Sequence, residues 1–137
     1  MPQPPGPAML DQLFDHNGLY ALRAAVAAHA ADFGTPERRV EDLVVIANEL
    51  ASNAVRHGGG GGRLLLWRNA TAVHCRVSDG GPGMAEPDTM GTRRAAPAAT
   101  GGRGLWIVRR LCDRLDVDTG PSGTTVTAIV LIGNIAG

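Results

Sequence analysis

The sequence predicts an α+β fold in which helices pack on a β-sheet. The prediction comes from the order in which helix-like and strand-like patterns follow one another along the chain. Apolar residues recur at helical spacing over residues 18–34 and 35–57. Segments of strand character follow at 63–68, 72–80 and 116–133, with a third helical stretch at 103–117 among them. Helices first, then strands, one helix and more strands are typical of a layered α+β sandwich.

Start and stop signals frame the first two helices. Gly34 ends the first. Thr35 is suited to be the N-cap of the second, with Pro36 at its first helical position and Gly58 as its stop. The inward residues are expected to be Leu19, Leu22, Val26, Ala30 and Phe33 in the first helix, and Val40, Leu43, Val44, Ala47, Leu50, Ala51 and Ala54 in the second.

The rest of the chain is expected to form strands, a loop and a helix. RLLLWR and AVHCRVSDG, joined at NAT, predict an antiparallel pair. Residues 84–101 show no sustained period and several breakers, which indicates a long loop of the lid or disordered kind. A strand, a GPSG turn at 120–123 and a final strand close the chain. The third helix is expected to direct inward Leu105, Val108, Leu111, Cys112 and Leu115.

Composition and charge indicate one cytoplasmic domain. A Pro-rich arm, residues 1–9, is expected to be disordered or extended before a single domain at 10–137. Lys plus Arg total 13 and Asp plus Glu total 13, so no net field favours nucleic acid or an anionic membrane. The start lacks the pattern of a signal peptide, and no run reaches the length of a membrane span. Cys75 and Cys112 are expected to be buried, reduced thiols rather than one disulfide.

Glu49 and Asn53 are two polar residues one turn apart on an otherwise apolar helix. A helical wheel places them roughly opposite the apolar stripe. An isolated Glu on a helix is most often solvated. The neighbouring Val45 and Ile46 favour instead a face covered by a ligand or a loop.

Asp79 ends a strand whose alternation places it on the inward face with Val73, Cys75 and Val77. A carboxylate there needs hydrogen-bond donors. An Asp-Gly turn that satisfies its own backbone is the simpler interpretation. An inward carboxylate beside open glycine backbone also suits an exocyclic amine, such as that of adenine.

The glycines of TGGRGLWIV, at 101, 102 and 104, come directly before a helix. Bare backbone at a helix start presents N–H donors and the positive end of the dipole to an anion. Arg103 could add a charged donor to a phosphate. A hinge between loop and helix is the alternative, and the two roles are compatible. The chain contains no GxxxxGK[ST] phosphate-binding loop.

Taken in order, NELASNAVRHG, DGGPG, GGRGL and SGTTV resemble the N, G1, G2 and G3 boxes of the GHKL ATPase superfamily, across roughly residues 35–132. By itself SGTTV would be only a hairpin turn. The resemblance implies the Bergerat fold, a two-layer α/β sandwich with a mixed, mostly antiparallel sheet covered by about three helices. It also implies ATP and Mg²⁺ as ligands and an ATP lid at about 84–101.

The resemblance implies a role for each matching residue. Glu49 would be the general base, and Asn53 would coordinate Mg²⁺ through its amide oxygen beside the nucleotide phosphates. Asp79 would accept a hydrogen bond from the adenine amino group. The other nucleotide-binding residues would be Gly81 and Gly83 at the base, Gly102, Arg103, Gly104 and Leu105 at the phosphates, and Thr124 or Thr125 near the adenine.

Within the superfamily the chain looks like the small stand-alone anti-sigma-factor serine/threonine kinases of bacteria. A sensor histidine kinase would need a helix pair bearing an acceptor His, and His29 is isolated on an Ala-rich helix. Members with a transducer domain need more chain after Gly137. The resemblance implies a sigma factor and a STAS-type anti-anti-sigma factor as partners, and a homodimer paired through a first strand, for which QLFD at 12–15 is the candidate. The alternative is a non-enzymatic ATP-binding module whose nucleotide-ordered lid gates a protein interaction.

Overall fold

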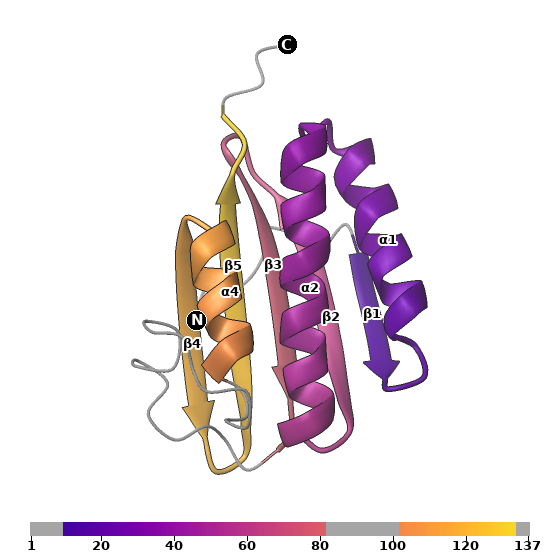
Figure 1. Ribbon diagram of the computed structural model, residues 1–137, viewed down its shortest axis with the longest axis vertical. Coiled ribbons are helices and arrows are strands. Elements are labelled where there is room, and N and C mark those ends of the chain that lie inside the picture. Colours follow the sequence, from indigo (N-terminus) through magenta and orange to yellow (C-terminus); the bar gives the residue numbers. More distant parts are fainter. Residues whose placement is uncertain (1–9, 82–101, 134–137) are drawn as a thin grey trace.

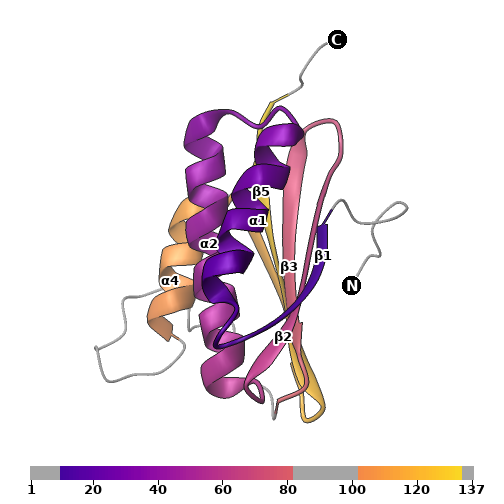
Figure 2. The ribbon, with the colours of Figure 1, turned by 90° about the vertical axis from the view of Figure 1, so that its right-hand side faces the viewer.

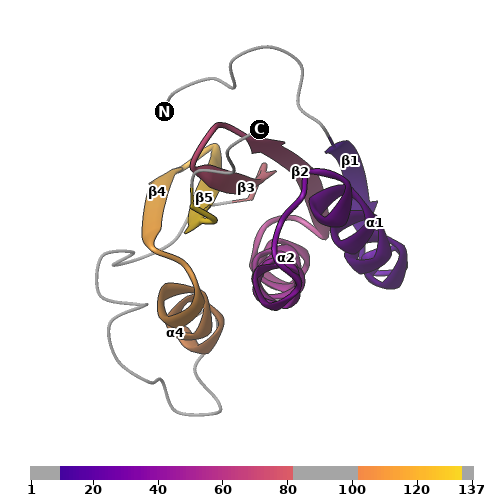
Figure 3. The same cartoon turned by 90° about the horizontal axis from the view of Figure 1, so that it is seen from above.

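The computed structural model describes residues 10–81 and 102–133, which form the predicted α+β sandwich. The described strands make one sheet in the order β1-β2-β3-β5-β4, and each neighbouring pair is antiparallel, so this sheet is not mixed. The described helices all lie on one face of it (Figure 1, Figure 3). In chain order the elements are β1 (Leu10–Asp15), α1 (Leu19–Asp32), α2 (Glu37–His57), β2 (Gly61–Arg68), β3 (Ala72–Asp79), α4 (Gly102–Leu111), β4 (Arg114–Gly120) and β5 (Gly123–Leu131).

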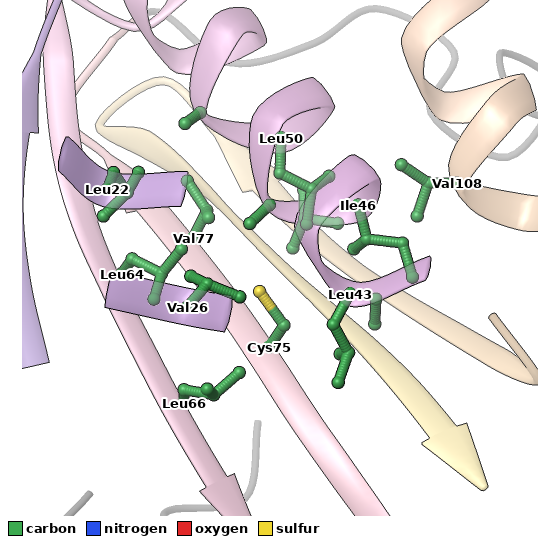
Figure 4. Packing of buried hydrophobic residues seen from close by; sticks show 14 of the residues in the cluster. Leu22, Val26, Leu43, Ile46, Leu50, Leu64, Leu66, Cys75, Val77 and Val108 are labelled. Atoms are coloured by element: carbon green, nitrogen blue, oxygen red, sulfur yellow. The ribbon is translucent and has the colours of Figure 1, made fainter. Parts of the chain in front are cut away.

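Helix α2 is the centre of the helical layer, with α1 on one side and α4 on the other (Figure 1). Its apolar side chains meet the inward residues of β2 and β3, as Figure 4 shows for Leu43, Leu50, Leu64 and Cys75. Each of these four is at most 2% exposed. Most of the predicted stripe of α2 is therefore core, and its remaining members, Val40 and Val44, are partly buried against it. Among the described residues no helix is both long and apolar enough to cross a membrane.

The segment QLFD lies in a strand, as the sequence indicated. β1 pairs with β2 from Leu10 opposite Leu66 to Asp15 opposite Gly61. Alternation along β1 buries Leu10 and Phe14 and leaves Leu13 77% exposed. β1 is an edge strand of the sheet, and Figure 2 shows it beside α1. Pairing of this edge in a homodimer stays a prediction.

The predicted extent of the third helix is wrong, because α4 ends at Leu111. Two hydrogen bonds then join the chain to β5 of the sheet. Asp113 N–H donates to the Ile129 carbonyl (2.9 Å), and Asp113 Oδ2 accepts from Leu131 N–H (2.8 Å). Leu115 therefore lies on β4, opposite Ala128, and not on a helix.

The predicted start of α2 is wrong by one residue. Pro36, with φ −55° and ψ 142°, is the N-cap, and the helix begins at Glu37. The Pro36 carbonyl accepts from the N–H groups of Arg39 and Val40, which leaves Thr35 outside the helix. Thr35 is buried and its Oγ1 has no hydrogen-bond partner in the part of the chain that is described.

Arg39 ties the beginning of α2 to the end of α4. Its Nη1 donates to Asp42 Oδ2 (2.8 Å) and to the Leu111 carbonyl (3.3 Å), and its Nη2 donates to Asp113 Oδ2 (2.6 Å). Its Nε donates to the Leu131 carbonyl at 3.2 Å. One guanidinium thus joins α2, the C-terminus of α4 and the end of β5, which fixes the C-terminal end of α4.

Both cysteines are free thiols, as predicted. Cys75 is fully buried, and burial raises the pKa of its thiol to about 12. Cys112 is only half-buried, so the prediction of burial holds for one of the two; burial is also the main cause that raises the pKa of Cys112.

The face of the sheet away from the described helices carries an aromatic and cationic stack. Trp67 and His74 stack at 4.9 Å between ring centroids, and the Arg76 guanidinium lies 5.0 Å from the Trp67 ring centroid. Arg76 Nε also donates to Thr127 Oγ1 at 3.0 Å. Burial, and then the Arg76 charge, hold the pKa of His74 below its ordinary value. Cross-strand contacts thus stiffen this face.

We expect Leu43→Ala to lower the free energy of unfolding by about 3 kcal/mol, because it deletes fully buried methyl groups and leaves a cavity between α2 and the sheet. Val45→Ala, on the same helix at 40% exposure, should change it by less than about 0.5 kcal/mol. Urea denaturation measures both. Equal losses would contradict the assignment of Leu43 to the core.

Candidate functional site

The first turn of α4 lies directly against the polar edge of α2. A Cβ added at Gly104 would stand 3.1 Å from Glu49 Oε2 and 3.2 Å from both Oδ1 and Nδ2 of Asn53. Two residues predicted from one segment and a glycine predicted from another therefore meet at one place. The close approach depends on Gly104 having no side chain.

Asn53 is not opposite the apolar stripe of α2, as the helical wheel suggested. It is 6% exposed and borders the core. Ten residues after Leu43, at about 100° a residue, it points only about 80° away from the direction of Leu43. Asn53 lies on the side of α2 that faces α4, and Glu49, on the same side, is half-buried. The polar pair therefore lies between two helices and not on an open face.

Asn53 and Asp79, 26 positions apart in the sequence, line one pocket between α2 and the sheet. Asp79 and Thr124 are directly opposite each other on β3 and β5. Thr124 is buried, and its Oγ1 lies 2.8 Å from Thr119 Oγ1. The full lining is Leu50, Asn53, Ala54, His57, Val77, Asp79, Thr124 and Val126. The pocket thus has apolar walls with a few polar groups, the usual make-up of a ligand site.

Two glycines set the position of Asp79. Its Oδ1 accepts a hydrogen bond from Gly81 N–H at 2.9 Å, as the simpler interpretation of an Asp-Gly turn required. A Cβ at Gly58 would stand 2.2 Å from Asp79 Cγ, and one at Gly81 would stand 2.4 Å from Gly58 Cα. Gly58 is thus more than a helix stop, because the carboxyl group rests on it.

The pocket holds two polar atoms without partners. Asn53 Nδ2 and His57 Nε2 are buried and make no hydrogen bond within the described part of the chain. A buried unpaired polar group costs about 1–3 kcal/mol, so a ligand that pairs with one gains what the free protein lacks. The pocket encloses ≈20 Å³, room for about one water molecule. A purine base would therefore need the pocket walls to move apart.

The predicted threonines separate on the two faces of β5. Thr124 lines the pocket, whereas Thr125, one position along the strand, has its side chain on the opposite face. Of the two, Thr124 is thus the one that lies in the pocket, and its role near an adenine stays a prediction.

The predicted phosphate end is the start of α4. Gly102 and Arg103 open the helix. Leu105 is fully buried in the core, so it has only its backbone to offer a phosphate. Gly83 and the lid predicted at 84–101 lie outside the described residues.

Sequence reasoning missed Arg56 and His57 as site residues, although both follow Asn53 at helical spacing. Arg56 Nη2 donates to Asn53 Oδ1 at 3.3 Å, and His57 lines the pocket. The signal that could have found them is the neighbourhood of residues three and four apart on a helix.

The oxygen-bearing side chains beside the start of α4 suit Mg²⁺ next to nucleotide phosphates, whereas the pocket as it stands is too small for the base. Glu49 Oε2 and the side-chain amide of Asn53 lie close together beside Gly104 of α4, and oxygen ligands such as these two groups offer are what Mg²⁺ prefers. No group of three or more His, Cys, Asp or Glu among the described residues could hold a metal alone. A metal ion here would need further oxygens from a phosphate or water, which is how Mg²⁺ is commonly held at nucleotide sites.

The histidine kinase-like ATPase domain family matches residues 14–130, so the chain belongs to that family. Nucleotide binding is the property that defines the class. A search of curated protein sequences finds no match.

Solved structures share this fold. The RsbU and RsbW domains of Rv1364c from Mycobacterium tuberculosis superimpose with a TM-score of 0.64 at 21% identity, over 89% of this chain and 32% of that one. The histidine kinase domain of a blue-light activated histidine kinase from Erythrobacter litoralis gives 0.55 at 20% identity, over 83% and 65%. The chain thus spans about a third of the first protein and just under two thirds of the second. At these identities the likeness is one of fold.

We expect Gly58→Ala to destabilise the protein by at least about 2 kcal/mol, because its Cβ would overlap the Asp79 carboxyl group. Gly80→Ala, next to Asp79 in the sequence, is the matched control, since a Cβ there meets nothing within 4 Å. Thermal unfolding of both variants measures the difference. A Gly58→Ala protein as stable as Gly80→Ala would show that the carboxyl group does not rest on Gly58.

Proposed function

We propose that this chain binds ATP·Mg²⁺ and acts as a protein serine/threonine kinase of the anti-sigma-factor kind. The observation that carries the proposal is the meeting of Glu49, Asn53 and the first turn of α4 above a pocket that ends at Asp79. Membership of the histidine kinase-like ATPase domain family supports the nucleotide. The serine/threonine acceptor and the partners are the finer part of the proposal.

The base end of the nucleotide is proposed to lie at Asp79. Asp79 Oδ1 is engaged by Gly81 N–H, which leaves lone pairs of the carboxylate for the amino group of adenine. Thr124, opposite Asp79 on β5, supplies a hydroxyl group beside it, directly or through water. Val77 and Val126 provide apolar surface for the ring.

The phosphate end is proposed to lie at the start of α4. The free N–H groups of the first helical turn and the positive end of its dipole attract an anion. Asn53 would offer its amide oxygen to Mg²⁺, and Glu49 stands beside it at the same helix start. When bound, the metal ion would neutralise charge on the phosphates.

The proposed transfer uses Glu49 as the general base. Its carboxylate takes the proton of a serine hydroxyl on the partner protein, and the serine oxygen bonds to the γ-phosphorus. The bond from that phosphorus to the bridging oxygen of ADP breaks, so the products are phosphoserine and ADP. The pocket orients the adenine and α4 orients the phosphates, which is most of what a phosphoryl transfer needs from a protein.

The proposed partners are a sigma factor, which the chain would sequester, and a STAS-type anti-anti-sigma factor, which it would phosphorylate. The fold shared with the structure that contains RsbU and RsbW domains supports this choice. A second candidate is a non-enzymatic module in which nucleotide only gates a protein contact. The narrow pocket favours it, because opening the walls for a base would itself be a conformational change.

We expect ADP and a non-hydrolysable ATP analogue to bind more tightly with Mg²⁺ than without it. Asn53→Ala should lose that Mg²⁺ effect, because the amide oxygen is gone, whereas Ser52→Ala, one residue away, should keep it. Calorimetric titration measures both. A wild-type chain that ignores adenine nucleotides would end the proposal.

We expect the wild-type chain to transfer phosphate from labelled ATP to a STAS-domain protein. Glu49→Gln should slow the transfer by about 10²–10⁴-fold, the usual contribution of a general base. It should leave the affinity for ADP within about two-fold, which separates chemistry from binding. Nucleotide binding with no transfer to any STAS protein of the same genome would favour the non-enzymatic module.

A further inference from the structure

Arg56 holds the amide oxygen of Asn53. It follows Asn53 by three positions on α2 and is itself exposed, and its Nη2 donates to Asn53 Oδ1 at 3.3 Å. A guanidinium has donors only, so the atom that faces it must be the oxygen of the amide and not the nitrogen. The contact therefore sets the orientation of the Asn53 amide, which leaves Nδ2 buried and without a partner among the described residues.

That orientation of the Asn53 amide leaves its Nδ2 buried without a hydrogen bond among the described residues, which is unfavourable. Asn53 is 6% exposed, and a turn of the amide would exchange the places of Oδ1 and Nδ2. The cation at Arg56 opposes such a turn, because the turn would point an N–H₂ group at a guanidinium. The free protein thus keeps the oxygen toward a positive charge at the rim of the pocket.

We propose that Arg56 is a placeholder for the metal ion: it presents Asn53 Oδ1 in the nucleotide-free chain and yields it when Mg²⁺ arrives with a nucleotide. The inference rests on the proposed function. A metal ion on this oxygen, at the usual distance of about 2.1 Å, would stand close to the guanidinium, and two cations so close repel. Mg²⁺ must therefore displace Arg56, whereas a nucleotide without metal can bind and leave the contact intact.

A simpler role for Arg56 makes a different prediction. If the guanidinium only attracts the negative charge of the nucleotide, its removal weakens binding with and without Mg²⁺ alike. Competition for Asn53 Oδ1 changes the ratio of the two affinities. That ratio is therefore the quantity to measure.

The experiment compares wild type, Arg56→Met and Arg38→Met. Met keeps the length of the stem and is a good helix former, and Arg56 is exposed, so the variant should fold. Arg38 is an exposed arginine on the first turn of the same helix, roughly 27 Å away by the rise of 1.5 Å a residue, and controls for the lost charge. The affinity for ADP is measured by calorimetry with saturating Mg²⁺ and with a chelator.

We expect the factor by which Mg²⁺ tightens ADP binding to rise about five-fold in Arg56→Met, the worth of one charge-assisted hydrogen bond at a partly exposed site. Arg38→Met should leave the factor unchanged. A factor in Arg56→Met equal to or below that of wild type would overturn the inference alone, provided that Asn53→Ala still abolishes the Mg²⁺ effect. A wild-type chain that binds no ADP, or binds it without any effect of Mg²⁺, would overturn the proposed function and this inference with it.

Discussion

The contact between the first turn of α4 and the polar edge of α2 is the constraint on which the site depends. It brings Glu49 and Asn53, which belong to one helix, against the backbone of another at the single point where Gly104 has no Cβ. Arg39 fixes the opposite end of α4 to α2 and to β5. Held at both ends, α4 can neither slide nor tilt without losing buried contacts or hydrogen bonds to charged groups, and so its N-terminus stays beside the two polar side chains.

The sheet imposes the second constraint through its register. β3 and β5 pair so that Asp79 stands opposite Thr124, and a shift of one residue in either strand would turn the side chain of that strand to the other face. The contact between Gly58 and Gly81 then lets the end of α2 approach the end of β3 closely enough for one pocket to reach from helix to strand. The pocket between the helical layer and the sheet thus needs two things: Asp79 and Thr124 in the right register, and glycines at 58 and 81, where no Cβ keeps the two backbones apart.

Much of the fold and of the site could be predicted from the sequence. A helix or strand that is buried on one side has apolar residues at a regular spacing, and that spacing can be seen in the sequence. The alternation through Val73, Cys75 and Val77 indicated which way Asp79 faces, and the glycines before Leu105 indicated the start of α4. The end of α4 could not be predicted in this way. Leu115 keeps helical spacing with Leu111, and only the hydrogen bonds of Asp113 to a strand sixteen to eighteen residues later draw it into the sheet.

The same limit applies to the site. Thr124 and Thr125 are equal candidates in the sequence, and the pairing of β5 with β3 separates them. The expectation that Asn53 lies opposite the stripe was wrong already on the wheel, which places it about 80° from Leu43. What the wheel cannot show is the contact with α4, a segment about fifty residues later. Gly58 was read as a stop signal, and its contact with Asp79 depends on a strand that ends twenty-one residues further on.

The unpaired atoms of the pocket are consistent with a site prepared for a ligand, on energetic grounds. Asn53 Nδ2 and His57 Nε2 each carry a penalty of about 1–3 kcal/mol while unpaired, a noticeable share of the 5–15 kcal/mol that stabilises a domain. An apolar side chain of similar size at either position would carry no such penalty. The penalty falls to zero when a partner arrives, so it adds to the affinity of whatever pairs with these atoms. The two unpaired side chains therefore favour a state in which a partner pairs with them over the free state.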